Sequence, residues 1–167
     1  MSHQNAFEES ATHKIKFLVL DVDGVMTDGG MYYTESGDQF KKFNTKDGMA
    51  IKIALGKGLE VAFLSSGSTE NIIQNRAKTL GVPRVYVGAR PKLEVLNEWC
   101  KELNISTQNV AYIGDDINDL GVFDAVAFSG CPQDAVEAIK MKAHVILKKK
   151  GGDACIREFV DEHLLDD

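Results

Sequence analysis

The stretch FLVLDVDGVMTD, residues 17–28, places two aspartates directly after an apolar run and just before a glycine. The continuous apolar run predicts a buried strand, in which side chains point alternately to opposite faces. Asp21 and Asp23 would therefore share a face if the strand continued that far, and Gly24 would let the chain turn sharply beside a ligand. Two neighbouring carboxylates either share a proton or bind a cation, whereas the ordinary alternative is a turn-forming or helix-capping pair.

The rest of the chain alternates strand-like and helix-like runs, which indicates βαβ units and a parallel sheet. We therefore expect an α/β fold, a Rossmann-like three-layer α/β/α arrangement around a parallel central sheet. The expected strands are KFLVLDV, GLEVAFLSS, RVYVGA, NVAYIGD, AVAFSG and AHVIL. Residues 29–45 break the alternation with two short β-like arms around ESGD, which predicts a small hairpin flap next to the paired aspartates.

Length and composition favour one globular domain, since the chain has 167 residues of which 44% are apolar. We expect a flexible leader at 1–13 and one domain at 14–167 that ends in a tail at 148–167. The formal net charge of −6 disfavours nucleic-acid binding, and no apolar run is long enough to span a membrane. The leader is polar and the three cysteines are far apart, which favours reduced thiols and a cytoplasmic location.

A second acidic group follows the run NVAYI in the segment GDDIND. The carboxyl ends of parallel strands lie at one edge of a sheet, so this group should meet the first one. Oxygen ligands without organised Cys or His favour Mg²⁺ over zinc. The predicted metal ligands are Asp21, the backbone carbonyl of Asp23 and Asp115, and the predicted metal-orienting residues are Asp116, Asn118 and Asp119.

Two further residues at strand ends predict phosphate binding. The hydroxyl of Ser65 and the amides after it could hold a phosphate oxygen, and the ammonium of Lys92 could neutralise phosphate charge. Taken alone, Ser65 is equally a helix cap and Lys92 a solvated lysine. Together with the acidic groups they predict a phosphoryl-transfer site, in which Asp21 attacks phosphorus and Asp23 protonates the leaving oxygen and then activates water.

The ordered motifs DVDGVMTD, Ser65 after VAFL, Lys92 and GDDIND resemble those of the haloacid dehalogenase superfamily of phosphohydrolases. The segments KDGMAIK, NRAKTLGV, VAYIGDDINDL and KKKGGDACIREF resemble its small capless branch of 3-deoxy-D-manno-octulosonate 8-phosphate (KDO 8-phosphate) phosphatases. GGMYY and KKFNT lean toward the related 9-phosphate phosphatases of nine-carbon sialic-type acids. The second motif departs from the family, because SSGSTE lacks the usual arginine and leaves Ser66 as an alternative to Ser65 for phosphate binding.

The resemblance implies an Mg²⁺-dependent phosphoric monoester hydrolase that releases KDO for lipopolysaccharide precursors and has no cap domain. It also implies a homotetramer, in which the hairpin packs on neighbouring subunits and the Gly151-Gly152 segment approaches a neighbouring active site. Lys46, Gly67 and Arg157 are the candidates for substrate contacts, and a salt bridge on the last helix is the alternative for Arg157. The other functions considered are a nine-carbon acid phosphatase, a phosphotransferase and a non-catalytic module, and the complete set of acidic and basic residues disfavours the last.

Overall fold

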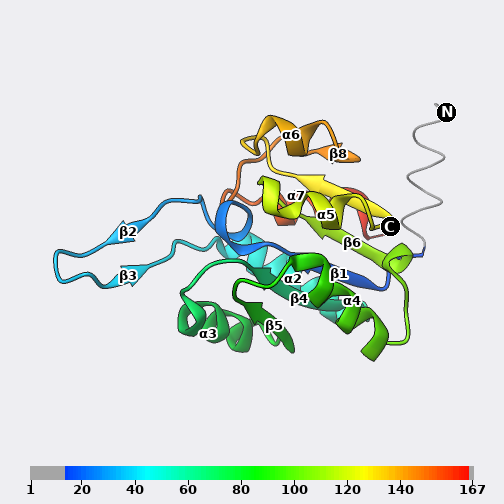
Figure 1. Cartoon of the computed structure of the whole chain (residues 1–167), viewed down its shortest axis with the longest axis horizontal. Helices are drawn as coiled ribbons and strands as arrows, with labels where there is room; N and C mark the ends of the chain where they lie inside the picture. The colour runs from blue at the N-terminus through cyan, green and yellow to red at the C-terminus, as the bar shows by residue number, and fades with distance from the viewer. Residues whose placement is uncertain (1–13, 166–167) are drawn as a thin grey trace.

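A six-stranded parallel sheet forms the centre of the computed structural model, which describes residues 14–165. The expected leader at 1–13 lies outside the described residues. The strands run in the order β5-β4-β1-β6-β7-β8, so the α/β fold expected from the alternating pattern is confirmed (Figure 1). Their bounds are β1 Phe17–Leu20, β4 Glu60–Ser65, β5 Arg84–Val87, β6 Val110–Ile113, β7 Phe128–Cys131 and β8 Val145–Ile146.

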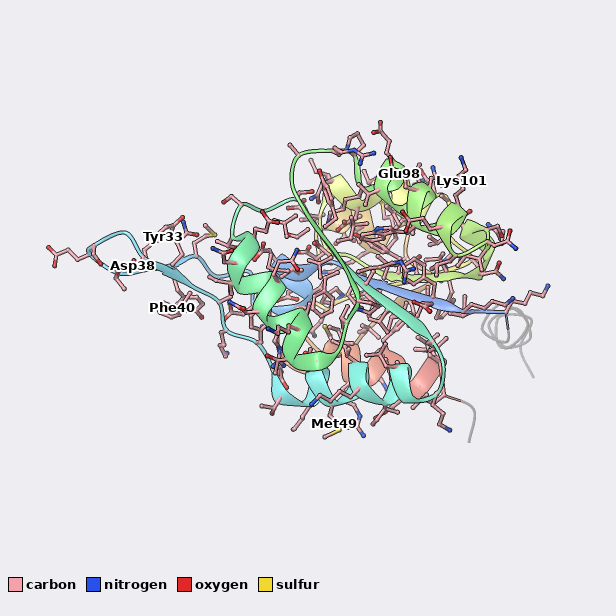
Figure 2. All side chains as sticks on the ribbon, turned by 90° about the horizontal axis from the view of Figure 1, so that it is seen from below. Tyr33, Asp38, Phe40, Met49, Glu98 and Lys101 are labelled. Atoms are coloured by element: carbon pink, nitrogen blue, oxygen red, sulfur yellow. The ribbon has the colours of Figure 1, made fainter. Side chains whose placement is uncertain are left out.

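Helices cover both faces of this sheet. Their bounds are α2 Thr45–Gly56, α3 Glu70–Leu80, α4 Lys92–Glu102, α5 Leu120–Phe123, α6 Glu137–Lys140 and α7 Cys155–His163, with short turns η1 Val22–Met26, η2 Thr107–Asn109 and η3 Ile117–Asp119. Figure 2 shows α4 on one side of the sheet and α2 and α7 on the other. Among residues 14–165, none of the helices combines the length and the apolar composition that a membrane span requires.

Two hydrophobic cores follow from the alternation of side chains along β1. Leu18 and Leu20 point into the core under α2, α3 and α7, whereas Phe17 and Val19 point into the core under α4, α5 and α6. All four side chains are fully buried, because β1 is a central strand between β4 and β6 and helices cover both of its faces. A strand that is covered on both faces needs a continuous apolar run, and residues 17–20 have this pattern.

The predicted hairpin is present as β2 Tyr32–Tyr33 and β3 Gln39–Phe40, which pair antiparallel and project from the body (Figure 1). The rings of Tyr32 and Phe40 stack with centroids 5.1 Å apart. Met31, Tyr33 and Phe40 nevertheless stay more than half exposed. A two-stranded hairpin is marginally stable by itself, so these apolar side chains leave a surface available for packing. No cap domain occurs among residues 14–165.

The segment expected as a tail contains the helix α7, which packs into the core. Its helix α7 contributes four fully buried side chains to the core under α2, which are Cys155, Ile156, Phe159 and Val160. The buried carboxylate of Asp47 on α2 accepts the amide hydrogen of Arg157 at 2.9 Å in the first turn of α7. Burial raises the pKa of Asp47 to about 6, while amides of α7 oppose this shift.

Candidate active site

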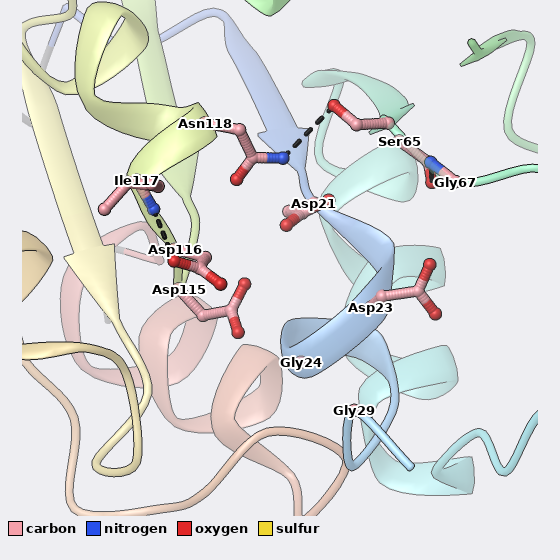
Figure 3. A pocket seen from close by; sticks show the side chains of 11 residues that line it. Asp21, Asp23, Gly24, Gly29, Ser65, Gly67, Asp115, Asp116, Ile117 and Asn118 are labelled. Carbon is pink, nitrogen blue, oxygen red and sulfur yellow. Dashed lines mark hydrogen bonds between the residues drawn. The ribbon is translucent and has the colours of Figure 1, made fainter. Parts of the chain in front are cut away.

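Three strand ends open into one cavity of about 370 Å³. Asp21 directly follows β1, Ser65 ends β4, and Asp115 lies just beyond the end of β6. The central β1, with β4 on one side and β6 on the other, marks the switch point where open parallel sheets bind ligands. Figure 3 shows the cavity, which is lined by Asp21, Asp23, Gly24, Gly29, Ser65, Ser66, Gly67, Asp115, Asp116, Ile117 and Asn118.

The loop after β1 turns the two aspartates apart. The regular strand ends at Leu20, and residues 22–26 form a tight turn, so the condition for a shared strand face is not met. Asp21 is buried and lies near Asp115, whereas the half-buried Asp23 points away from that residue (Figure 3). The amide of Val22 donates to Asp21 Oδ1 at 2.7 Å and fixes the orientation of the carboxylate.

Gly24 makes this turn possible, because its φ of +84° lies in the left-handed region. A Cβ at this position would lie 2.0 Å from Asp115 Oδ2, so the absence of a side chain lets the loop approach the second acidic group. The hydroxyl oxygen of Thr27 accepts the amide hydrogens of Gly24 and Gly29 at 3.3 and 3.2 Å. These two hydrogen bonds hold the loop closed, and the glycine at position 24 lets it lie close to Asp115.

Lys92 sits behind the cavity floor, and its burial excludes the alternative of a solvated lysine. Its Nζ lies 2.8 Å from Asp21 Oδ1 and 2.6 Å from Asp119 Oδ1. The buried hydroxyl of Tyr112 donates to the same Asp119 oxygen at 2.6 Å. Lys92 therefore links the carboxylate of Asp21, after β1, to the carboxylate of Asp119, in η3. Through Asp21 it contacts the lining of the cavity.

The charges in this cluster are unbalanced. Burial and the charge of Asp119 raise the pKa of Asp21 well above its ordinary value, against the opposing effect of Lys92. Burial and Asp119 also raise the pKa of Asp115 to about 6. Burial lowers the pKa of Lys92, but Asp21 and Asp119 outweigh it and the net pKa is raised. One ammonium among three carboxylates leaves excess negative charge, which a bound cation would offset.

The donor set fits a hard divalent cation. Carboxylate oxygens of Asp21, Asp115 and Asp119 lie within 4.8 Å of one another. Both oxygens of Asp119 are already engaged, because Oδ1 contacts Lys92 and Oδ2 accepts the amide hydrogens of Asp115 and Asp116 at 2.9 and 3.2 Å. Asp119 thus orients the acidic loop, and Asp21 and Asp115 keep oxygens open to the cavity. Oxygen-only ligands of this kind suit Mg²⁺.

The loop after β4 supplies the polar wall opposite the acids. Ser65 is almost fully buried, and its Oγ accepts the Gly67 amide hydrogen at 3.0 Å. Ser66 is exposed, and its Oγ accepts a hydrogen bond from Asn118 Nδ2 at 3.1 Å. Asn118 therefore ties the loop after β4 to η3, across the cavity mouth. Asp116 is exposed and accepts the amide hydrogen of Ile117, so its side chain caps the η3 turn.

Two predicted substrate contacts lie outside this cavity in the same chain. Lys46 and Arg157 line a separate hollow of about 310 Å³ together with Lys148 and Lys149. Arg157 Nε pairs with Asp161 at 2.5 Å on α7, which is the alternative interpretation given for this residue. The third predicted contact, Gly67, does line the acidic cavity.

Two neighbours of the site, Lys41 and Tyr112, carry no recognisable signal in the sequence, and a third, Gly151, was expected to approach the active site of a neighbouring subunit. Lys41 forms an ion pair with Asp23, Tyr112 supports Asp119, and Gly151 packs on the loop after β1. The Gly152 amide donates to the Val25 carbonyl at 2.9 Å, so the double glycine lies against the acidic loop of its own chain. Lys41 and Gly151 reach the site only through the packing of segments that are distant in the chain.

The strand order and the acids at the strand ends define a class, the haloacid dehalogenase-like hydrolases. A family model with this description, Hydrolase_3, matches residues 84–158. KDO 8-phosphate phosphatase KdsC of Escherichia coli K12 is 36% identical over 151 residues, which cover 90% of this chain and 80% of that protein. The chain belongs to the KDO 8-phosphate phosphatase family of these hydrolases.

Solved structures agree with this assignment. A probable YrbI family phosphatase of Pseudomonas syringae superposes with a TM-score of 0.91 at 37% identity and covers 96% of this chain and 90% of that one. KDO 8-phosphate phosphatase of Moraxella catarrhalis, in complex with a magnesium ion, a phosphate ion and KDO, superposes with a TM-score of 0.90 at 29% identity over 97% and 92% of the two chains.

Proposed function

We propose that this protein is an Mg²⁺-dependent phosphatase that hydrolyses KDO 8-phosphate to KDO and phosphate. The observation that carries the proposal is the cavity in which the ends of β1, β4 and β6 present carboxylates opposite a hydroxyl, with the Lys92 ammonium beneath. The KDO 8-phosphate phosphatase of Escherichia coli K12, which is named for this activity, is identical to the chain at 36% of 151 aligned residues, and these cover 90% of the chain.

The chemistry divides between two aspartates. An oxygen of Asp21 attacks phosphorus, the bond from phosphorus to the sugar oxygen breaks, and Asp23 gives that oxygen a proton. A water molecule then attacks the aspartyl-phosphate and loses its proton to Asp23, and the bond between phosphorus and Asp21 breaks. Mg²⁺ held by Asp21, Asp115 and the carbonyl of Asp23 would offset repulsion between the carboxylate and the phosphate.

The other residues of the cavity bind and orient. Lys92 neutralises charge as phosphate enters, and it holds Asp21 in place through their 2.8 Å contact. Ser65 is the proposed phosphate ligand in preference to Ser66, since its hydroxyl lies at the end of the buried strand beside the Gly67 amide. Asp119 keeps the amides of the β6 loop in position, and Asn118 holds that loop to the serine loop.

A phosphatase screen with Mg²⁺ tests the proposed substrate. The panel contains KDO 8-phosphate, nine-carbon acid 9-phosphates and common sugar phosphates, with Asp21→Asn as the inactive control. We expect the highest kcat/KM for KDO 8-phosphate. A large preference for a nine-carbon 9-phosphate would replace the substrate and keep the mechanism, whereas a second phosphosugar among the products would indicate phosphotransfer.

We further propose a homotetramer that works in the cytoplasm and supplies KDO for lipopolysaccharide precursors. The exposed Met31, Tyr33 and Phe40 on the projecting hairpin support packing between copies, and the buried thiols of Cys100, Cys131 and Cys155 suit a reducing compartment. Light scattering should give four chains for the native protein. A Tyr33→Ser, Phe40→Ser variant should give a smaller mass, and an unchanged mass would place the interface elsewhere.

A further inference from the structure

The returning arm of the hairpin brings Lys41 to the acidic loop. Lys41 directly follows β3, and its Nζ forms an ion pair with Asp23 Oδ1. Its side chain is only 9% exposed, although other large side chains of the hairpin face outward. Of the cations in residues 14–165, Lys41 alone is paired with the Asp23 carboxylate.

The next residue provides an internal comparison. Lys42 has a 65% exposed side chain, and its Nζ stays 3.7 Å from Asp28 Oδ2. The two lysines are adjacent and each approaches one aspartate of the same loop. Only Lys41 has a largely buried side chain in direct contact with its aspartate. Exposed pairs of the Lys42 kind contribute little, because solvent screens them and the side chains lose freedom.

Asp23 is bracketed between the hairpin and the loop after β4. A Cβ on Gly67 would lie 3.0 Å from Asp23 Oδ2 and 3.1 Å from Ser65 Oγ. Oδ1 is held by Lys41 on the other side, so the carboxylate has a fixed place at the cavity wall beside Ser65. Without the ion pair, the half-exposed carboxylate would be free to rotate toward solvent, because Gly67 offers no side chain to retain it.

We propose that Lys41 is a positioning residue, which holds the Asp23 carboxylate where it exchanges protons with the leaving oxygen and with water. The inference rests on the proposed acid–base role of Asp23. It makes the hairpin part of the active site of its own chain, so that the placement of the flap controls the acid–base step. Catalysis depends steeply on such placement, since small displacements of a reacting group are costly.

The test compares Lys41→Met, Lys41→Gln and Lys41→Arg with the matched control Lys42→Met. The two neutral Lys41 variants should lower kcat for KDO 8-phosphate by roughly ten- to a hundredfold, a part of the 10²–10⁴ that acid–base catalysis contributes. KM should change little, Lys41→Arg should recover most of kcat, and Lys42→Met should stay close to native. Two neutral variants are used so that poor folding of one leaves the other to decide, with Tm measured for each.

Two further measurements separate positioning from substrate binding. Release of p-nitrophenolate from p-nitrophenyl phosphate in the first turnover should fall less than alkyl phosphate turnover, because that leaving group departs without a proton. In an Asp23→Asn background, Lys41→Met should change kcat by less than about twofold, since residues that act as a unit are not additive.

The outcomes distinguish failure of the acid–base role of Asp23 from failure of the positioning role of Lys41. If Asp23→Asn turns over at the native rate, the acid–base assignment of Asp23 fails and the proposed mechanism fails with it. If Asp23→Asn is impaired but the losses add in the double variant, or Lys41→Met raises only KM, Lys41 contacts substrate itself and the positioning inference is wrong. Equal effects of Lys41→Met and Lys42→Met would also overturn it.

Discussion

The Gly151→Ala substitution tests whether the C-terminal double glycine braces the acidic loop. A Cβ on Gly151 would lie 1.9 Å from the Gly24 carbonyl oxygen, 2.6 Å from its carbonyl carbon and 2.9 Å from the Thr27 carbonyl oxygen. All three atoms are backbone, so no side chain can rotate out of the way. Either the loop after β1 or the segment before α7 has to shift.

The expected loss of stability in Gly151→Ala follows from overpacking. Extra atoms in a packed site cost about 1–3 kcal/mol, and 1 kcal/mol shifts Tm by about 2–4 °C for a chain of this length. The Tm should therefore fall by roughly 2–12 °C. The shift should also reach Asp115, a proposed metal ligand, because Gly24 packs on it on its other side. Loss of such support typically weakens metal affinity by about 10–100-fold.

Gly56→Ala is the matched control, since nothing lies within 4 Å of a Cβ at that exposed position at the end of α2. Calorimetric unfolding gives Tm, and titration calorimetry gives Mg²⁺ affinity for both variants. We expect Gly56→Ala to match the native protein or exceed its stability slightly, because alanine favours a helix. Equal Tm and equal Mg²⁺ affinity in the two variants would refute the bracing role of Gly151.

Three further results are expected. Asp21→Asn should abolish turnover and the acid-stable trapping of phosphate on the protein while preserving the oligomer, and near-native turnover would exclude the covalent route. EDTA should stop the reaction and Mg²⁺ should restore it, whereas full activity in EDTA would exclude the metal. Burial raises the pKa of Asp47 from 3.8 to about 6. Its protonation therefore stabilises the fold below about pH 4, and roughly 3 kcal/mol is lost as pH rises through 6; urea unfolding of Asp47→Asn should lack this loss, and parallel pH profiles would contradict it.

Several elements were predictable because their signals are local. Continuous apolar runs gave the strands, and the turn residues ESGD marked the hairpin between Tyr32 and Phe40. The positions of Asp21, Ser65 and Asp115 at one edge followed from a general property of parallel sheets. The end of β1 was less predictable, since the turn at 22–26 separates Asp21 from Asp23 where alternation would have kept them together.

The apolar pattern of the C-terminal helix could be read from the sequence, but the surface on which the helix packs could not. Cys155, Ile156, Phe159 and Val160 have helical spacing and are all fully buried. A helix with such a stripe needs a partner surface, and the pattern does not say which surface it finds. In the structure it packs on α2 on the same face of the sheet, so removing residues from Gly151 onward would remove part of the core as well as the glycine brace.

The sequence by itself determined the chemistry, because residue types and their positions after apolar runs specify carboxylates, a hydroxyl and an ammonium at strand ends. Only the tertiary structure decided how these groups act on one another. Alternation predicts that Lys41 and Lys42 face opposite ways, but long-range packing selects Lys41 for Asp23. Lys92 likewise meets Asp119 because β1, β5 and β6 are ordered in one sheet, and strand order depends on the burial of whole faces and not on any short motif.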